Sequence, residues 1–162
     1  MTNSIPPASL IAAHAERDQP GATFRALDEA LSRSPGHILF TVLVHHPRAR
    51  ESERFYSNRP EEYPVGGRKP VTDSAWMQRV IHEGRPWIGR NANDVRWAFF
   101  DHALIDSLGC QSALNMPVRW GGETLGTLNL LAGPAHYDES HLPEVELLAH
   151  LALPALMLIA RV

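Results

Sequence analysis

The sequence predicts a single α+β domain in which helices cover both faces of an antiparallel sheet. Helical and strand-like patterns follow one another in the order helix, two strands, helices, strand hairpin and long helix, which is typical of this class. A length of 162 residues suits one domain with its own core. The apolar content of 44% is ordinary for a globular protein, which argues against general disorder.

The N-terminal segment is expected to form an arm outside the domain. Residues 1–20 contain three prolines, which interrupt regular structure and leave room for only a short helix at residues 8–16. We therefore expect a loose arm over residues 1–20 and a single domain over residues 21–162.

The first regular elements are a helix and two strands. Residues 22–32 carry apolar side chains at helical spacing and end before a Pro-Gly pair. Residues 37–45 (HILFTVLVH) are apolar on both faces, which favours a central strand that is covered on two sides. Residues 53–57 form a shorter strand, which can pair with the central strand across the charged turn at residues 46–52.

The middle of the chain combines a long loop with a helix. Residues 58–71 are too long and too poor in apolar side chains to serve only as a connection. Thr72 or Asp73 can cap a helix that runs to about Glu83, with Trp76 facing inward.

Three further elements complete the chain around a hairpin. Residues 86–89 are typical of a short strand, and residues 94–108 have apolar side chains at helical spacing. The last helix is expected at residues 139–160, where Pro154 should kink it.

The hairpin between these helices carries an unusual pair of amides. Two apolar strands, residues 112–118 and 124–131, flank a Gly-Gly turn at residues 121–122. Each strand contains one asparagine, Asn115 or Asn129, where a core strand would ordinarily carry Val or Ile. A buried amide needs hydrogen-bond partners, so this hairpin is either a satisfied core element or the wall of a polar-lined pocket.

The pairing register decides how the two asparagines lie. A two-residue turn that pairs Trp120 with Glu123 places Asn115 opposite Leu128. A three-residue turn or a bulge shifts the register by one residue and places Asn115 opposite Asn129. The alternate positions of the first strand are apolar and suit a helix-packed face, so we expect the asparagines to face a pocket.

The hairpin also carries a family resemblance. Residues 107–131, with SLGCQSALNMPV, a short turn and GTLNLL, resemble the strand–turn–strand signature of GAF domains. The resemblance extends over residues 21–158. The stretches YPVGGRKP at residues 63–70 and RWAFFDH at residues 96–102 are similar to a bacterial subgroup of small standalone GAF proteins.

The resemblance implies both a fold and a function. It implies an antiparallel sheet of about six strands, with the terminal helices on one face and a pocket on the other, roofed by loops and short helices. GAF domains bind cyclic nucleotides, bilins, haem, amino acids or aromatic effectors, and many dimerise through their terminal helices. We therefore expect a regulatory ligand-binding module that acts as a homodimer or through a partner protein. A small enzyme in the same pocket and a dimerisation module with a vestigial pocket are the alternatives.

The ligand signatures of the family do not recur in this sequence. Cys110 is followed by Gln111, whereas bilin attachment resembles Cys-His. The sulfoxide reductases of the family need a resolving cysteine, and Cys110 is the only cysteine of the chain. The residue set of the cyclic-nucleotide domains is not recognisable. We therefore expect no cofactor.

Aromatic and charged side chains of the expected roof are candidates for ligand binding. A guanidinium group binds a carboxylate in a bidentate manner, and aromatic rings suit a planar ligand. In the alternative interpretation, the aromatic side chains only cover the sheet while the arginines lie in solvent. The candidate ligand-binding residues are Tyr63, Arg68, Trp76, Trp97, Phe100, Asp101, His102, Asn115 and Asn129.

Catalytic candidates are few. Asp101 next to His102 suggests a general base, but neighbours on one helix point about a hundred degrees apart and would not face each other. Cys110 follows the end of a helix, where the helix dipole does not favour a thiolate. The histidine pairs lack metal-ligand spacing, so we expect no metal site. We favour binding over catalysis.

Composition excludes several partners. A formal net charge of −3 gives no electrostatic footprint for nucleic acid. The N-terminus lacks the basic region of a signal peptide. The longest apolar stretch, near residues 147–160, is too short to span a bilayer. We expect a cytoplasmic protein that binds neither membranes nor nucleic acid.

Overall fold

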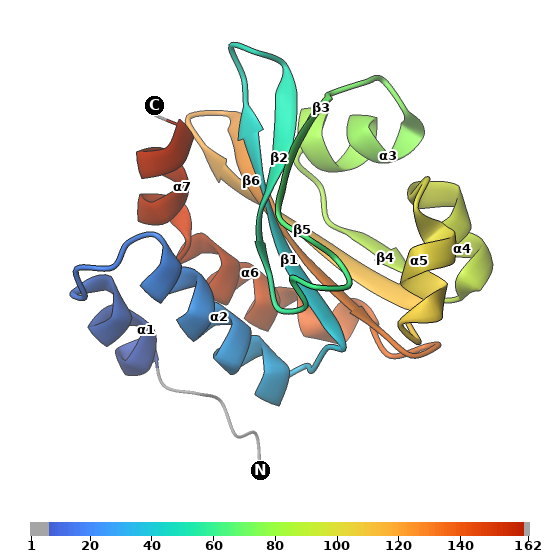
Figure 1. The fold of residues 1–162 in the computed structure, drawn as a ribbon, viewed down its shortest axis with the longest axis horizontal. Helices are drawn as coiled ribbons and strands as arrows, with labels where there is room; N and C mark the ends of the chain where they lie inside the picture. Colours follow the sequence, from blue (N-terminus) through green and yellow to red (C-terminus); the bar gives the residue numbers. More distant parts are fainter. Residues whose placement is uncertain (1–6, 161–162) are drawn as a thin grey trace.

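The computed structural model describes residues 7–160 and confirms the predicted α+β class. Its centre is one six-stranded sheet in the order β3-β2-β1-β6-β5-β4, in which every neighbouring pair is antiparallel (Figure 1). The strands are β1 (Leu39–His46), β2 (Glu51–Ser57), β3 (Gly66–Pro70), β4 (Trp87–Gly89), β5 (Ser112–Trp120) and β6 (Glu123–Ala132).

The helices form a layer on each face of the sheet (Figure 1). The terminal helices cover one face: α1 (Pro7–His14), α2 (Gly21–Arg33), α6 (Leu142–His150) and α7 (Leu153–Ala160). Four short segments cover the other face: α3 (Ala75–Met77), the π-helical η1 (Gln78–His82), α4 (Ala92–Ala98) and α5 (His102–Ser107). This second layer is called the roof below.

The main core lies between the sheet and the terminal helices. The β5 side chains of Leu114, Met116 and Val118 enter it, as the alternation of the strand predicts. Phe24 of α2 and Leu156 of α7 close it from the helix side. A smaller apolar cluster lies under α4 and α5 and contains Leu39, Val95, Ile105, Cys110, Ala113 and Leu131.

The hairpin adopts the register that pairs the two asparagines. The Gly-Gly turn at residues 121–122 takes positive φ angles of 59° and 83°. A bulge next to Val118 then shifts the pairing, so that Val118 lies opposite Gly126 and Asn115 lies opposite Asn129. A two-residue turn and a shifted register therefore occur together, because the bulge supplies the shift.

Strand β3 lies inside the segment that the sequence predicts to be a loop. It reads GGRKP, has no apolar alternation, and all five residues are exposed. A short edge strand with Lys, Gly and Pro resists pairing with other chains, and its pairing depends on backbone hydrogen bonds rather than on side chains. A hydrophobic pattern therefore cannot reveal it.

The prediction of a single helix at residues 94–108 is wrong, because the structure has two helices there. The helix breaks at Phe99, whose backbone is extended with φ −123° and ψ 126°. The side chain of Phe99 packs against Trp76 and Trp87, with ring centroids 5.6 and 6.1 Å apart. Burial of this ring offsets the loss of helical hydrogen bonds.

The helix predicted from residue 72 begins later. Ser74, rather than Thr72 or Asp73, caps it by accepting a hydrogen bond from the Met77 N–H. The helix then widens into the π-helical η1, and Gly84 with φ +63° follows its end.

The N-terminal segment is packed more closely than the predicted arm. Helix α1 matches the short helix expected there, and the side chain of Leu10 is fully buried in the main core against α2. The described part of residues 1–20 therefore contributes to the main core.

The C-terminal helix is divided as its proline predicts. Asp138 caps the short η2 (Glu139–His141), and α6 and α7 meet at a bend of 54°. Within residues 7–160 no single helix is long and apolar enough to cross a membrane, and only the bent pair of C-terminal helices meets that test together.

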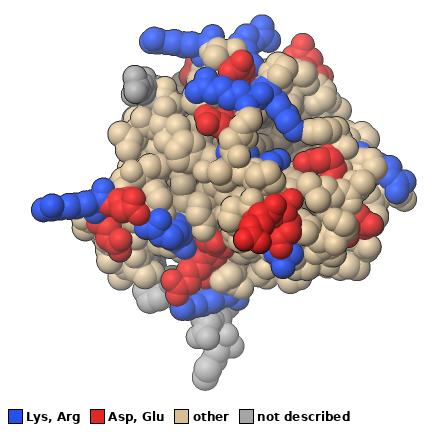
Figure 2. All heavy atoms as spheres, in the orientation of Figure 1, with Lys and Arg blue, Asp and Glu red and all other residues tan. Residues whose placement is uncertain are grey.

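The face in Figure 2 is largely uncharged, and side chains of both signs lie near one another in several separate places. The exposed ion pairs of the described residues include Arg25 with Asp18 at 2.7 Å and Arg33 with Glu29 at 2.5 Å. Exposed pairs of this kind contribute little to stability.

Candidate ligand-binding site

A line of hydrogen bonds crosses the roof side of the sheet. The indole Nε1–H of Trp76 donates to Asn115 Oδ1 at 3.0 Å, and Asn115 Nδ2 donates to Asn129 Oδ1 at 2.7 Å. Asn129 Nδ2 donates in turn to Thr41 Oγ1 at 3.3 Å. We call these four residues the amide line. It joins β5, β6 and β1 and ties α3 to the sheet.

The amide line is buried and its amides are satisfied. Asn115 is 0% exposed and Asn129 4% exposed, so each amide depends on the protein for its hydrogen bonds. Removal of one partner would leave a buried polar group unpaired, at a cost of about 1–3 kcal/mol. The hydrogen bond from Trp76 to Asn115 therefore fixes the distance between α3 and the sheet.

A cavity of about 170 Å³ lies beside the amide line, between the sheet and the roof. Thr41 and Asn129 form part of its floor, and Trp76 and Phe99 form part of its roof. It lies on the face of the sheet that is away from the terminal helices, as the asparagines predict. Its other lining residues are Leu43, Ser52, Arg54, Tyr63, Gly66, Gly67, Lys69, Ser74, Met77, Ala98, Phe100, Asp101, Ile105 and Leu131.

One corner of this cavity is charged. The Tyr63 hydroxyl donates to Asp101 Oδ2 at 2.5 Å, and burial together with this carboxylate raises the pKa of Tyr63 well above its usual range. The Arg54 guanidinium lies 3.7 Å above the Tyr63 ring centroid, and its Nη2 is 3.7 Å from Asp101 Oδ2. Arg54 Nη1 donates to the Pro64 carbonyl oxygen, whereas the buried Arg54 Nε has no protein partner.

The mouth of the cavity carries a second cation. Lys69 Nζ lies 3.7 Å from the centroid of the Phe100 ring, and Phe100 is 76% exposed. Partial burial lowers the pKa of Lys69, although the carboxylate of Asp101 opposes this shift. The cavity thus has two cationic side chains and one carboxylate.

Most of the predicted ligand-binding residues come together here. Tyr63, Trp76, Phe100, Asp101 and Asn129 line the cavity. Asn115 lies beneath Trp76 as the next member of the amide line.

Three predicted residues lie elsewhere. Arg68 projects from the exposed β3 and lies 3.5 and 3.6 Å from the carboxylates of Glu51 and Glu53. Trp97 is 57% exposed and stacks on Trp87. His102 lines a different cavity, together with Arg96 and Cys110. The break at Phe99 places Trp97 on α4 and His102 on α5, so the two do not share one helix.

The catalytic candidates do not form a constellation. The carboxylate of Asp101 turns to Tyr63 and Arg54 rather than to His102. Cys110 is buried, and burial raises the pKa of its thiol to about 11, which leaves little thiolate at neutral pH. Within residues 7–160 no three His, Cys, Asp or Glu side chains are grouped to hold a metal ion.

Arg54 is the residue that the sequence analysis missed. It lies in a strand that the analysis did predict, and it shares the roof side with Ser52, two residues before it. The sequence shows an arginine in this strand but not its burial, which depends on the segments that cover it in the folded protein.

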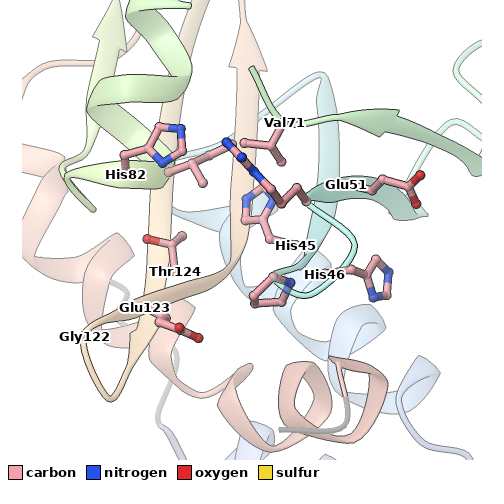
Figure 3. A pocket seen from close by; sticks show the side chains of 11 residues that line it. His45, His46, Glu51, Val71, His82, Gly122, Glu123 and Thr124 are labelled. Atoms are coloured by element: carbon pink, nitrogen blue, oxygen red, sulfur yellow. The ribbon is translucent and has the colours of Figure 1, made fainter. Parts of the chain in front are cut away.

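A second cavity, of about 250 Å³, lies at the other end of β1 (Figure 3). His45 lies at its base and is 3% exposed, and neither ring nitrogen has a protein partner. Burial lowers the pKa of His45 to about 4, and His46 and His82 add smaller contributions. The other charged side chains around it are Arg50, Glu51 and Glu123.

The fold is that of a known domain family. A family model described as GAF domain matches residues 17–157. The GAF domain from an Acinetobacter phosphoenolpyruvate-protein phosphotransferase has a TM-score of 0.71 at 12% identity, covering 96% of this chain and 92% of that chain. The GAF domain of a sensor histidine kinase from Bacillus halodurans has a TM-score of 0.68 at 12% identity, covering 84% and 92%.

An enzyme shares the same fold. Free methionine-R-sulfoxide reductase from Neisseria meningitidis, in complex with its substrate, has a TM-score of 0.65 at 19% identity and covers 96% of this chain and 87% of that chain. No curated protein matches this chain by sequence. At such identities the likeness shows the fold alone.

His45 makes stability depend on pH. Its pKa is about 4 in the folded protein and about 6.5 when unfolded, so the unfolded chain binds more protons between these values. Folding should therefore lose about 3 kcal/mol from this group as the pH falls from 6.5 to 4. Urea denaturation across this range should show a smaller loss in His45→Phe. Equal slopes in the two proteins would contradict the prediction.

Proposed function

This chain belongs to the GAF domain family, and we propose that it is a sensory module whose ligand carries a carboxylate group and a small apolar portion. The observation that carries the proposal is the unpaired Nε of Arg54. Its Nε is buried beside the cavity under the roof and has no protein partner, although its Nη1 is bonded. A carboxylate accepts well from such a preoriented guanidinium.

Charge and shape support this class of ligand. Arg54 and Lys69 outnumber the single carboxylate of Asp101, whose Oδ2 already accepts from Tyr63. The lining also includes apolar side chains, among them Phe99, Ile105 and Leu131. A volume of about 170 Å³ is small for a ligand site and favours a metabolite with few heavy atoms.

The amide line connects the cavity to the sheet, so a bound ligand can affect the position of the roof. Asn129 and Trp76 line the cavity and belong to the line that joins the roof to three strands. A ligand that contacts either side chain thus changes how the roof sits on the sheet. The kinase-derived GAF domain of similar fold is consistent with a sensory role.

A sensory module needs a surface that contacts another protein chain, and the terminal helices carry exposed apolar side chains suited to this. Ile11 on α1, Leu147 on α6 and Leu158 on α7 are 59%, 63% and 59% exposed. Large apolar side chains on that one layer favour association with a second copy of the chain. We propose that ligand binding is read out through such a homodimer.

The ligand proposal predicts selective binding of small carboxylates. Benzoate, phenylacetate and butyrate are suitable probes, and at least one should raise the melting temperature and give a dissociation constant by calorimetry. Arg54→Gln should weaken binding at least about tenfold, because it removes a charged hydrogen bond. Conversion of the probe into a product would instead indicate the enzyme alternative.

Arg68→Gln is the matched control for this experiment. Arg68 is a cation on the strand beside the cavity, but it is exposed and paired with Glu51 and Glu53. Its replacement should leave binding unchanged. The proposal is refuted if none of the probes binds, or if the two arginine variants weaken binding equally.

The dimer proposal predicts a sedimentation coefficient above that of an 18.0 kDa monomer. Leu147→Glu places a charge on the terminal-helix face and should shift the protein toward the monomer. Leu104→Glu, on the exposed side of α5, is the control and should leave the dimer intact. A monomer at every protein concentration tested would contradict this proposal.

A further inference from the structure

The second cavity is built from four segments of the chain. The turn between β1 and β2, Val71 after β3, the end of η1 and the β5–β6 hairpin line about 250 Å³ (Figure 3). Part of its wall is held by the backbone, since the Val71 N–H donates to the Arg50 carbonyl oxygen at 2.8 Å. The cavity shares no lining residue with the cavity beside the amide line.

Two buried polar side chains at its base lack protein partners. Both ring nitrogens of His45 and the hydroxyl Oγ1 of Thr124 are buried and make no hydrogen bond to the protein. Folded proteins leave few such groups, and each one needs an explanation. A neutral imidazole presents one donor and one acceptor, and the hydroxyl presents both. The base of the cavity therefore suits a group that donates and accepts.

His82 differs from His45 in this respect. Its Nε2 lies 3.3 Å from the Thr72 carbonyl oxygen and 3.6 Å from Asp73 Oδ1. The Nε2 atom of His82 therefore already has partners within the protein, and His82 lines the cavity without needing a hydrogen bond from a ligand. The unmet hydrogen-bonding capacity lies at His45 and Thr124.

The rim of the cavity carries charges of both signs. Glu51 lies 3.5 Å from Arg68, which partly neutralises it. Arg50 and Glu123 form no ion pair with another side chain of residues 7–160. A ligand with one positive and one negative group would complement this pair, whereas a phosphate or a polyanion would meet two carboxylates.

We propose that this cavity is a second ligand site, which takes a small zwitterion with a polar side chain, that is, a polar α-amino acid. The carboxylate and ammonium groups pair with Arg50 and Glu123 at the rim, and the polar side chain bonds His45 and Thr124 at the base. The site is independent of the carboxylate site beside the amide line.

The test uses the full chain with isotopically labelled histidine and follows the His45 ring nitrogens by NMR. The probes are L-serine, L-threonine, L-asparagine and L-glutamine, each titrated into the protein at neutral pH. At least one should shift the His45 resonances in a saturable manner. Glu123→Gln and Thr124→Val should each raise the dissociation constant about tenfold, since each removes a polar contact.

Two controls separate this site from other binding. Glu146→Gln removes an exposed carboxylate on α6 and should leave the dissociation constant unchanged. Arg54→Gln should also leave it unchanged, because Arg54 belongs to the other cavity. The inference is overturned if none of the four probes shifts His45. It is equally overturned if the shift persists at full affinity in Glu123→Gln, a surface substitution that should not impair folding.

Discussion

The buried hydrogen bonds of the amide line set both the pairing of the hairpin and the position of the roof. Asn115 and Asn129 can meet only because the β5–β6 hairpin contains a bulge beside Val118. Without that extra residue, Asn129 would turn toward the terminal helices and place an amide in the apolar core. The bulge thus keeps a polar row on one face of the sheet and an apolar row on the other.

The amide line also determines where cavities form. Trp76 anchors the first turn of the roof helix to the sheet, and the helix then widens into η1 on its way to His82. One cavity lies at each end of this segment, the first beside Trp76 and the second beside His82. Two cavities with different lining charges therefore border the same roof segment, one at each of its ends.

The break at Phe99 has a comparable role for the first cavity. It directs the Phe99 ring inward and frees Asp101 from the helix, so that its carboxylate reaches Tyr63 and Arg54. In the observed structure Asp101 precedes the first residue of α5 instead of lying within a continuous helix. The charged corner of the candidate site is therefore a product of a local interruption rather than of a regular element.

The parts of the fold with a regular hydrophobic pattern could be predicted from the sequence. These are the central strand, the hairpin and the terminal helices, each of which is apolar on a defined face. The two asparagines could be placed on a common face, but two registers remained open, because a bulge leaves no mark in the hydrophobic pattern.

The parts that sequence reasoning missed depend on tertiary contacts. Strand β3 has no side-chain pattern, and the helix break at Phe99 is driven by packing against Trp76 and Trp87. For a related reason Arg54 was not among the predicted residues, and His45 was considered only as a metal ligand and rejected. Each belongs to a strand whose identity was clear, and only the neighbouring roof segments show that the side chain is buried without a full set of partners.

Hydrogen exchange at the tryptophan indoles reports whether the hydrogen bond from Trp76 ties the roof to the sheet. The chain has four tryptophans, and Trp97 and Trp120 are 57% and 53% exposed, whereas Trp76 is 5% exposed and bonded to Asn115. We predict that the Trp76 indole N–H exchanges at least about a hundredfold more slowly than those of Trp97 and Trp120, and that Asn115→Ala removes much of this protection. Exchange at Trp76 as fast as at the two exposed tryptophans would show that the roof is not tied to the sheet, and would contradict this prediction.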